Sequence, residues 1–357
     1  MPEAVRPRTA AIIHPLVDLL SVGGLSILAL VPLLVSGRED LAFISLPAVA
    51  WAGALVNYSH FMASYRIIYR DREMILRHKW ASMGIPLILV GYSVVAFWQA
   101  EQQRPQLMGL IVGVGSAYLA WHYTGQVWGM MASYTHLSGG RFEPAERRLV
   151  RGSLRILLAW HVVWFARIWF GQTNLAEPFW LTPLYQAASA ATILALLLGA
   201  AGMTKMWLRT RRAPPARVVV AWLAIFCWYA AMARWGLPAL FLVQLAHAIQ
   251  YLEFPARVEI NRAIRAAPEG KLPVSGRLAA YVIVLLATSF LVTLLVPGPA
   301  MSVVADFLGV EPNRAAPLLL LMFINIHHYF TDGVAWKLSN PEVRKELFAH
   351  VRPAGSS

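Results

Sequence analysis

The sequence predicts an all-α polytopic integral membrane protein, a bundle of about ten transmembrane helices with both termini in the cytoplasm. Three observations predict this fold: the composition, the lengths of the apolar segments and the distribution of positive charge. Of the 357 residues, 58% are hydrophobic and only 14% are charged, whereas soluble domains carry about 25% charged residues. This composition excludes an ordinary water-soluble protein, and the 14 Trp, 15 Phe and 12 Tyr residues exclude a disordered chain.

Ten segments have the length and apolarity that a transmembrane helix requires, which is about 20 residues. The first contains Asp18 and has no small-residue cleavage site, so we expect it to stay in the protein as a helix. Together the ten segments are expected to form a single transmembrane domain over residues 1–357. The expected spans are 15–35, 41–63, 81–100, 106–134, 149–170, 181–204, 217–234, 238–254, 278–296 and 315–336.

Positive charge alternates between the loops that join these segments. With the N-terminus inside, the cytoplasmic segments hold 25 of the 31 Lys and Arg residues and the outer loops hold four. Lys and Arg collect in the cytoplasmic loops of membrane proteins. The net charge of +13 is therefore explained by topology, and no nucleic-acid partner is expected. We expect a multi-pass protein of the bacterial inner membrane.

Histidines gather on the cytoplasmic side of the predicted bundle, and none of the ten lies in an outer loop. Ionisable residues within a bilayer are costly and usually functional, and neutral imidazole is the commonest metal ligand. The single cysteine, Cys227, excludes a cysteine-based metal site. The sequence therefore predicts a buried metal site in the cytoplasmic half. Its candidate ligands are His14, Asp18, His60, His122, His247, His327, His328 and Asp332.

Most of these histidines have a carboxylate or an amide one helical turn away. Groups of this kind fix the orientation of a metal-bound imidazole, and the aspartates could instead be ligands in a mixed nitrogen and oxygen set suited to iron or manganese. The adjacent His327 and His328 point about 100° apart on a helix, so one of them needs a second buried partner. The spaced pairs are His14–Asp18, Asn57–His60, His122–Gln126, His247–Gln250, Asn325–His328 and His328–Asp332.

Simpler explanations remain open for individual histidines. His14 and His60 lie near predicted helix ends, where capping or snorkelling residues are common. His122 with Gln126 also suits a hydrogen bond between helices, which is a frequent stabilising contact in membrane bundles. His161 lies in a tryptophan-rich stretch of the fifth span, and for this residue we expect a packing role.

Several segments resemble stretches of known membrane proteins. HHYFTDG (327–333) resembles the paired-histidine segment of haem–copper oxidases and nitric oxide reductases, although here no later span follows to carry the haem ligands. AWHYTGQVWG (120–129) is similar to a segment of the bacterial Brp/Blh β-carotene cleavage family, whose iron histidines are scattered over several helices. The chain also resembles a group of uncharacterised bacterial polytopic membrane proteins, and this resemblance implies no activity. The segments that carry it are HPLVDLLSVGG, NYSHFMASYRIIY, HAIQYLEFP and NIHHYFTDGVAWKLSNP.

These patterns favour a membrane-embedded non-haem metal oxidoreductase that holds one or two iron ions. Its substrate would be a membrane lipid or isoprenoid, and a separate protein or quinone would donate electrons. Tyr251 and Tyr329, each close in sequence to a candidate ligand, are the candidate catalytic proton donors. The first alternative function is that of a haem-binding membrane protein that transfers electrons or handles a gas. The second is a proton-coupled transporter that uses the buried histidines and aspartates as a relay.

Overall fold

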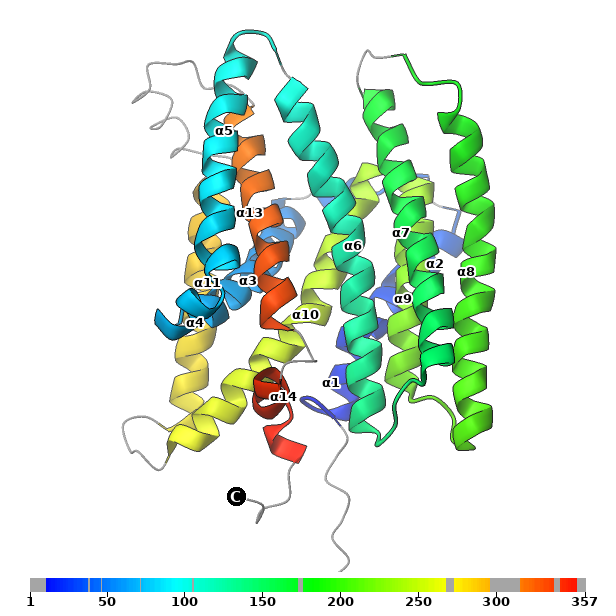
Figure 1. Ribbon diagram of the computed structural model, residues 1–357, viewed down its shortest axis with the longest axis vertical. Coiled ribbons are helices and arrows are strands. Elements are labelled where there is room, and N and C mark those ends of the chain that lie inside the picture. The colour runs from blue at the N-terminus through cyan, green and yellow to red at the C-terminus, as the bar shows by residue number, and fades with distance from the viewer. Residues whose placement is uncertain are drawn as a thin grey trace, which may run out of the picture. The chain divides into compact units, whose positions relative to one another are not determined.

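The fold is all-α throughout the part of the chain that the structure, a computed structural model, describes (Figure 1). The described residues are 11–37, 39–45, 47–70, 72–104, 106–172, 176–267, 273–295, 315–336 and 341–351. Two short elements, η1 (Leu20–Gly24) and η3 (Trp80–Gly84), are π-helical and two others are 3₁₀ helices, η2 (Ala42–Ser45) and η5 (Ala349–Val351). The α-helices are α1 (Pro15–Leu19), α2 (Leu25–Val35), α3 (Pro47–Ile68), α4 (Arg72–Arg77), α5 (Ile85–Glu101), α6 (Gln106–Leu137), α7 (Pro144–Gln172), α8 (Leu181–Thr210), α9 (Ala216–Trp235), α10 (Leu237–Ala266), α11 (Val274–Leu295), α13 (Ala315–Ala335) and α14 (Pro341–Leu347).

Eight helical stretches among the described residues are long and apolar enough to cross a membrane, so the chain is a multi-pass integral membrane protein. They correspond to eight of the ten expected spans. The other two, 41–63 and 106–134, fall on α3 and α6, which are 22 and 32 residues long. Polar side chains, among them His60 and His122, interrupt the apolar character of these two helices. The total of ten spans and the cytoplasmic location of both termini stay predictions.

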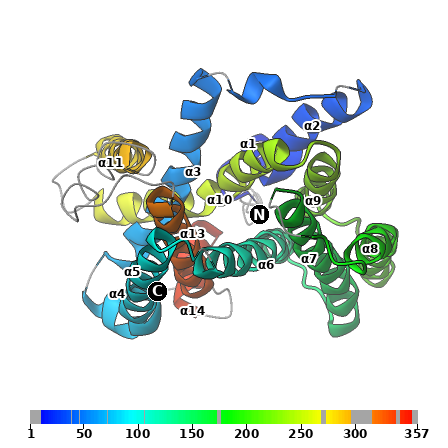
Figure 2. The ribbon, with the colours of Figure 1, turned by 90° about the horizontal axis from the view of Figure 1, so that it is seen from above.

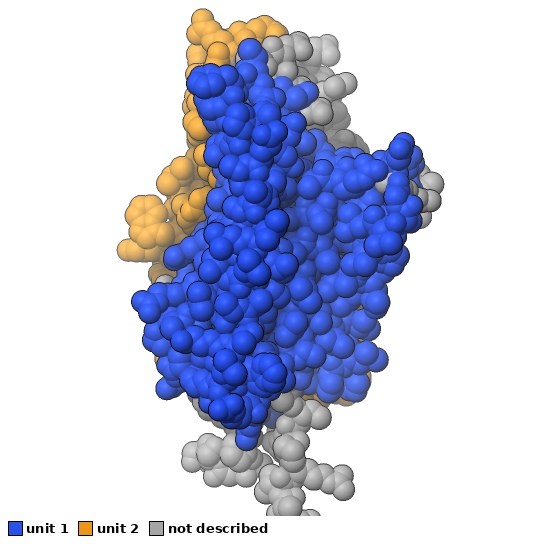
Figure 3. All heavy atoms as spheres, turned by 90° about the vertical axis from the view of Figure 1, so that its right-hand side faces the viewer, with its two compact units in different colours: residues 1–44, 120–261, 344–357 blue, residues 45–119, 262–343 orange. Residues whose placement is uncertain are grey.

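The chain divides into two compact units, which are coloured separately in Figure 3. The first unit contains residues 1–44, 120–261 and 344–357, and the second contains residues 45–119 and 262–343. The boundaries between them fall within η2, α6, α10 and α14. Each unit is described by itself below, and the single domain expected from the sequence stays a prediction.

In the first unit, α7 and α8 lie side by side and antiparallel (Figures 1 and 2). Glycines on α8 permit close approach of its neighbours. A Cβ atom at Gly202 would lie 2.7 Å from Val150 of α7, and one at Gly199 would lie 2.4 Å from the indole nitrogen of Trp222 on α9. At the cytoplasmic ends expected for these helices, Arg209 of α8 forms an ion pair with Glu146 of α7.

The N-terminal helix of the first unit is broken by η1, which packs against α9. Gly23 adopts a φ of +141°, a backbone conformation that favours glycine. A Cβ atom at Gly23 would lie only 2.3 Å from the Cβ of Ala224 on α9. Just beyond the break, the indole of Trp228 donates a hydrogen bond of 2.9 Å to Ser26 Oγ. Glycine at position 23 therefore allows both the bend and the close contact with α9.

In the second unit, α13 packs against α3, α5 and η3, and α11 packs against α3. The hydroxyls of Ser59 on α3 and Ser289 on α11 are 2.9 Å apart and share a hydrogen bond. The phenol of Tyr65 on α3 donates a hydrogen bond to the main-chain oxygen of Ile324 on α13. These contacts fix the facing surfaces of α3 and α13, on which several of the candidate ligands lie.

We predict that Gly23→Ala lowers the free energy of unfolding by at least about 2 kcal/mol, because it adds both backbone strain and a steric clash. The matched control is Gly91→Ala on α5, where an added Cβ meets no atom within 4 Å. The measurement is thermal unfolding of the two purified variants in the same mild detergent. Equal unfolding temperatures for the two variants would contradict the proposed role of Gly23.

Candidate functional site

The facing surfaces of α3 and α13 bring together two histidines and an aspartate in the second unit. The Nε2 atoms of His60 and His328 are 2.8 Å apart, and both side chains are almost completely buried, with 1% and 0% exposure. Oδ2 of Asp332 is 3.4 Å from the same nitrogen of His328. His328 and Asp332 are four residues apart on α13, so this contact follows from the helical repeat that the sequence shows.

Ser64 connects the members of this histidine–aspartate cluster (His60, His328 and Asp332). Its hydroxyl donates a hydrogen bond of 2.5 Å to Oδ1 of Asp332, and its oxygen lies 3.1 Å from Nδ1 of His328. Since the single hydroxyl proton is directed to the carboxylate, Ser64 accepts the hydrogen from His328 Nδ1. Ser64 thus fixes the ring orientation of His328 and the rotamer of Asp332 together.

The hydrogen bonds of the two imidazoles determine which nitrogens carry protons. Nδ1 of His60 lies 2.8 Å from the main-chain oxygen of Asn57, which can only accept. Nδ1 therefore carries the hydrogen in His60, and the bond to Ser64 requires the same of His328. In neutral rings with these tautomers, each Nε2 atom presents a lone pair, and the two lone pairs meet at 2.8 Å. A positive charge, either a proton or a metal ion, is needed to stabilise this contact.

The donor set and its spacing fit a metal ion. Two nitrogens bound to one metal at about 2.1 Å lie about 3.0 to 3.4 Å apart. The separations of 2.8 Å between His60 and His328 and of 3.4 Å between His328 and Asp332 are close to these values. Each histidine also donates the N–H of its other ring nitrogen, Nδ1, to an oxygen atom, as metal-bound histidines commonly do. His60, and His328 together with Asp332, each belong to a group of buried side chains that could hold a metal ion.

A second pair of buried histidines lies in the first unit, where α6 meets α10. The rings of His122 and His247 have their centroids 4.8 Å apart at an angle of 70°, and both residues could contribute ligands to a metal. The ring of Tyr123 lies 4.6 Å from His247. All three side chains are buried. The first unit therefore also places two candidate ligands within a buried environment that contains an aromatic ring.

Amide side chains support this second pair by holding the backbone. Gln126 donates hydrogen bonds to the main-chain oxygen of His247 at 3.1 Å and to Oε1 of Gln250 at 2.9 Å. Gln250 in turn donates to the main-chain oxygen of Val22 in η1, at 2.6 Å. The sequence spacing suggested that Gln126 orients the ring of His122. In the structure its amide joins α6 to α10, which is the hydrogen bond between helices that the sequence analysis gave as the alternative.

His327 faces different neighbours from those of His328, as the 100° spacing of adjacent helical residues requires. Its Nε2 atom donates a hydrogen bond of 2.9 Å to the main-chain oxygen of Ala81 in η3 and lies 3.3 Å from the hydroxyl of Tyr69. Its ring stacks on that of Tyr65. These contacts hold α13 against η3. They give His327 the second buried partner that was expected for one of the two adjacent histidines.

His14 and Asp18 occupy an anchoring site of the first unit. His14 is exposed, and its Nδ1 atom accepts the amide hydrogen of Leu16 at the start of α1. The fully buried carboxylate of Asp18 accepts hydrogen bonds from the backbone amides of Ile12, Ile13 and His14. Arg217 of α9 pairs with the same carboxylate at 2.9 Å. Asp18 thus ties the N-terminal turn to α9.

The two tyrosines expected to donate protons are both buried. The hydroxyl of Tyr329 donates a hydrogen bond of 3.3 Å to Oδ1 of Asn325, one turn earlier on α13. Its ring lies 5.8 Å from that of His328 and stacks on Tyr118. Tyr251 lies on α10, one turn after His247. Their catalytic roles stay predictions.

Two features of the buried network are not among the residues that the sequence analysis selected. Ser64 follows His60 by four residues, so the one-turn spacing applied to the other histidines would have found it. Glu253 of α10 is buried and accepts hydrogen bonds from the hydroxyls of Ser21 and Tyr134. Hydroxyl groups carry no charge signal in a sequence, and these three residues are far apart along the chain.

No family model, curated protein or solved structure matches the chain. The fold and the site are therefore interpreted from the structure itself. The structure is that of a polytopic helical membrane protein with buried histidine clusters that could hold a metal ion.

We predict that Asp18→Asn lowers the free energy of unfolding by about 3 kcal/mol, because Arg217 then loses the charge that compensates it in a buried site. Metal content of the folded fraction should not change. Glu39→Gln, at an exposed position, is the control. Unfolding in mild detergent and elemental analysis provide the two measurements. Loss of metal with unchanged stability would instead assign Asp18 as a ligand.

Proposed function

We propose that the protein is a membrane-embedded non-haem metalloenzyme, an iron-dependent oxidoreductase or oxygenase that acts on a lipid or isoprenoid. The observation that supports this proposal most directly is the approach of His60 and His328 through their Nε2 atoms, with Asp332 beside them. Their hydrogen bonds leave lone pairs directed at one another. A cation at this point would convert a repulsive contact into a stabilising one.

The donor set suits non-haem iron. Two histidines and one carboxylate form the ligand set that non-haem iron(II) oxygenases use, with other coordination positions left open for substrate and dioxygen. Such an ion would supply the redox chemistry and the activation of dioxygen or water. Cysteine is absent from both histidine clusters, which argues against thiolate-rich sites such as those of structural zinc or copper(I).

The location of these residues supports a hydrophobic substrate. The clusters lie on helices α3, α6, α10 and α13, within a chain that crosses the membrane several times. A lipid or isoprenoid reaches such helices laterally from the bilayer, without passing through water. The protein's own groups would exclude water, hold the metal ligands in fixed tautomers, and move protons through hydroxyls such as that of Tyr329. The electrons would come from a separate donor.

We predict that His328→Ala lowers iron affinity at least about 100-fold, because it removes a ligand and also releases Ser64 and Asp332. His60→Gln is a second variant that removes a different ligand with a smaller change in volume. His136→Ala is the control, since His136 is exposed on α6. The measurements are elemental analysis and an absorption spectrum of protein purified in mild detergent without chelator.

Each outcome of this experiment favours one hypothesis. One or two iron ions per chain that are lost in both variants and kept in the control support the proposal. A Soret band would favour the haem alternative. Folded protein with no stoichiometric metal would overturn both and leave a proton as the charge between His60 and His328, as a proton-coupled transporter requires.

We predict that Ser64→Ala weakens iron binding about 10- to 100-fold without abolishing it, because Ser64 orients two ligands and is not itself one. The matched control is Ser59→Ala, on the same helix, where the buried hydroxyl bonds to Ser289 and not to a histidine. Metal titration of stripped protein compares the two. If both variants bind iron equally well, the role of Ser64 as a positioning residue is wrong.

A further inference from the structure

Glu253 of α10 is a buried carboxyl group of the first unit, and only hydroxyl groups bond to it among the residues that the structure describes. Its side chain is 5% exposed. Oε1 is bonded to the hydroxyl of Tyr134 on α6, and Oε2 to the hydroxyl of Ser21 in η1. A carboxylate in a buried site is costly unless a cation pairs with it. The protonation state of Glu253 therefore matters to the fold.

The charged and titratable groups that surround this site are bonded to other partners. Asp18 of α1 pairs with Arg217 of α9, Arg257 of α10 donates to the main-chain oxygen of Ile12, and His350 of η5 donates to that of Ala11. Arg217 also lies over the ring of Tyr134, 5.0 Å from its centroid. Within the described part of the chain, no lysine or arginine forms an ion pair with Glu253, although Arg257 is only one helical turn away.

The hydrogen bonds of Ser21 indicate that Glu253 carries a proton. Ser21 Oγ lies within hydrogen-bond distance of Glu253 Oε2 and 3.2 Å from the main-chain oxygen of Asp18. If Glu253 is a carboxylate, both neighbours of the serine oxygen are acceptors, and the single hydroxyl hydrogen can satisfy only one of them. If Glu253 is a carboxylic acid, its O–H donates to Ser21 and Ser21 donates to Asp18. Both contacts are then hydrogen bonds.

The neutral acid also satisfies the other oxygen of Glu253. Oε1 becomes the carbonyl oxygen of the acid and accepts the hydroxyl hydrogen of Tyr134. Hydrogen bonds then follow one another in a single direction, from Tyr134 through Glu253 and Ser21 to Asp18, and bonds in such a chain strengthen one another. A proton on Glu253 therefore accounts for all these contacts and leaves no unpaired charge in the site.

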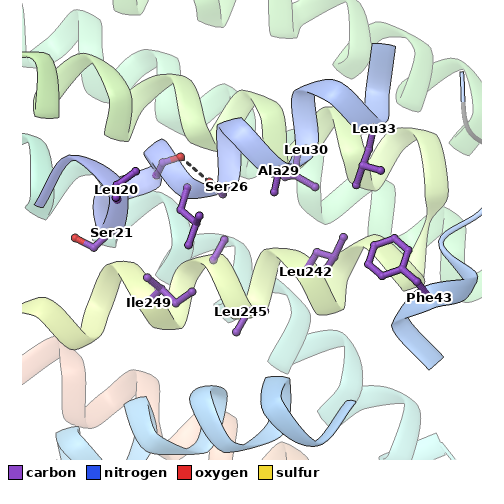
Figure 4. A pocket seen from close by; sticks show the side chains of 13 residues that line it. Leu20, Ser21, Ser26, Ala29, Leu30, Leu33, Phe43, Leu242, Leu245 and Ile249 are labelled. Atoms are coloured by element: carbon purple, nitrogen blue, oxygen red, sulfur yellow. Dashed lines mark hydrogen bonds between the residues drawn. The ribbon is translucent and has the colours of Figure 1, made fainter. Parts of the chain in front are cut away.

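Ser21 is the most accessible of the three side chains. It is half-buried, whereas Glu253 and Tyr134 are buried. In Figure 4 its hydroxyl points away from the aliphatic side chains that line the neighbouring apolar pocket. A hydroxyl group that accepts one hydrogen and donates another can pass a proton along a chain of hydrogen bonds. Ser21 is therefore placed to connect Glu253 with the outside of the site.

We propose that Glu253 is a proton-binding site, protonated in the resting protein, and that Ser21 is the group through which this proton exchanges. On release, the O–H bond of Glu253 breaks as its proton passes to Ser21 Oγ. The original hydrogen of Ser21 passes to a water molecule, which becomes hydronium, and Glu253 is left as a carboxylate. The site includes neither histidine cluster, so the inference does not rest on the proposed enzymatic function.

Infrared spectroscopy of the full-length protein in nanodiscs tests the protonation state, because a carboxylic acid has a C=O stretching band that a carboxylate lacks. We expect Glu253→Gln to remove one such band. Tyr134→Phe should shift that band to higher frequency, since it removes the hydrogen bond to Oε1. Glu39→Gln, at an exposed position, is the control and should remove carboxylate bands only. Loss of carboxylate bands alone in Glu253→Gln would overturn the proposal.

Thermal unfolding of Glu253→Gln tests the same state independently. The side-chain amide has the shape of a carboxylic acid, and it can donate to Ser21 and accept from Tyr134 in the same way. We therefore expect an unchanged unfolding temperature, in contrast to Asp18→Asn, where a charge that pairs with Arg217 is lost. A fall as large as that of Asp18→Asn would show that the structure depends on a charged Glu253 and would contradict the inference.

Hydrogen–deuterium exchange tests the role of Ser21. After transfer into D2O, the acid band of Glu253 shifts as its proton is replaced, and we expect Ser21→Ala to slow this shift about 100-fold. The matched control is Ser36→Ala at the exposed end of α2, whose hydroxyl also donates to a main-chain oxygen three residues earlier. Equal exchange rates in the two variants would overturn the assignment of Ser21 as the exchange route.

Discussion

A polar group that lies within the hydrocarbon of a membrane has no water to bond, and the protein must supply every partner. This constraint organises the buried polar residues of both units. Asp18 is surrounded by three backbone amides and an arginine, and Gln250 connects α6 to η1. In the cluster of His60, His328 and Asp332, by contrast, the hydrogen bonds place two lone pairs face to face. Protein groups alone satisfy the first two sites, whereas at the third either a proton or a metal ion lies between the two nitrogens.

Properties that are local in the sequence could be predicted, whereas contacts between distant residues could not. Apolar length located eight spans that the structure supports, because that property is local. Histidine content and the four-residue spacing of His328 and Asp332 identified the polar core of the second unit for the same reason. The sequence could not show that Asp18 anchors the N-terminal turn, since its partner Arg217 is 199 residues away. The one-turn spacing also applies to Ser64, but a hydroxyl is a weaker indication of a functional site than a charged or imidazole group.

The two histidine pairs are stabilised differently, and this bears on their chemistry. Around His60 and His328, the bonds are made by the ring nitrogens and fix the tautomers. Around His247, the bond from Gln126 is made to the backbone and positions the helix, and aromatic rings surround the imidazole. Fixed tautomers with oxygen partners raise the basicity of a ligand. The candidate ligands of the second unit are therefore the better oriented for a metal ion, and the first unit contains two further candidate ligands in apolar surroundings.

A lipid substrate would have to leave the bilayer to reach the buried candidate ligands. A buried polar cluster is accessible to a substrate only if the protein also provides an apolar surface that the substrate prefers to the lipid phase. Because the lipid phase is itself apolar, burial of a hydrocarbon chain in a protein pocket gains little from the hydrophobic effect alone. Selectivity for a lipid substrate must therefore come from the shape of its site and from polar contacts.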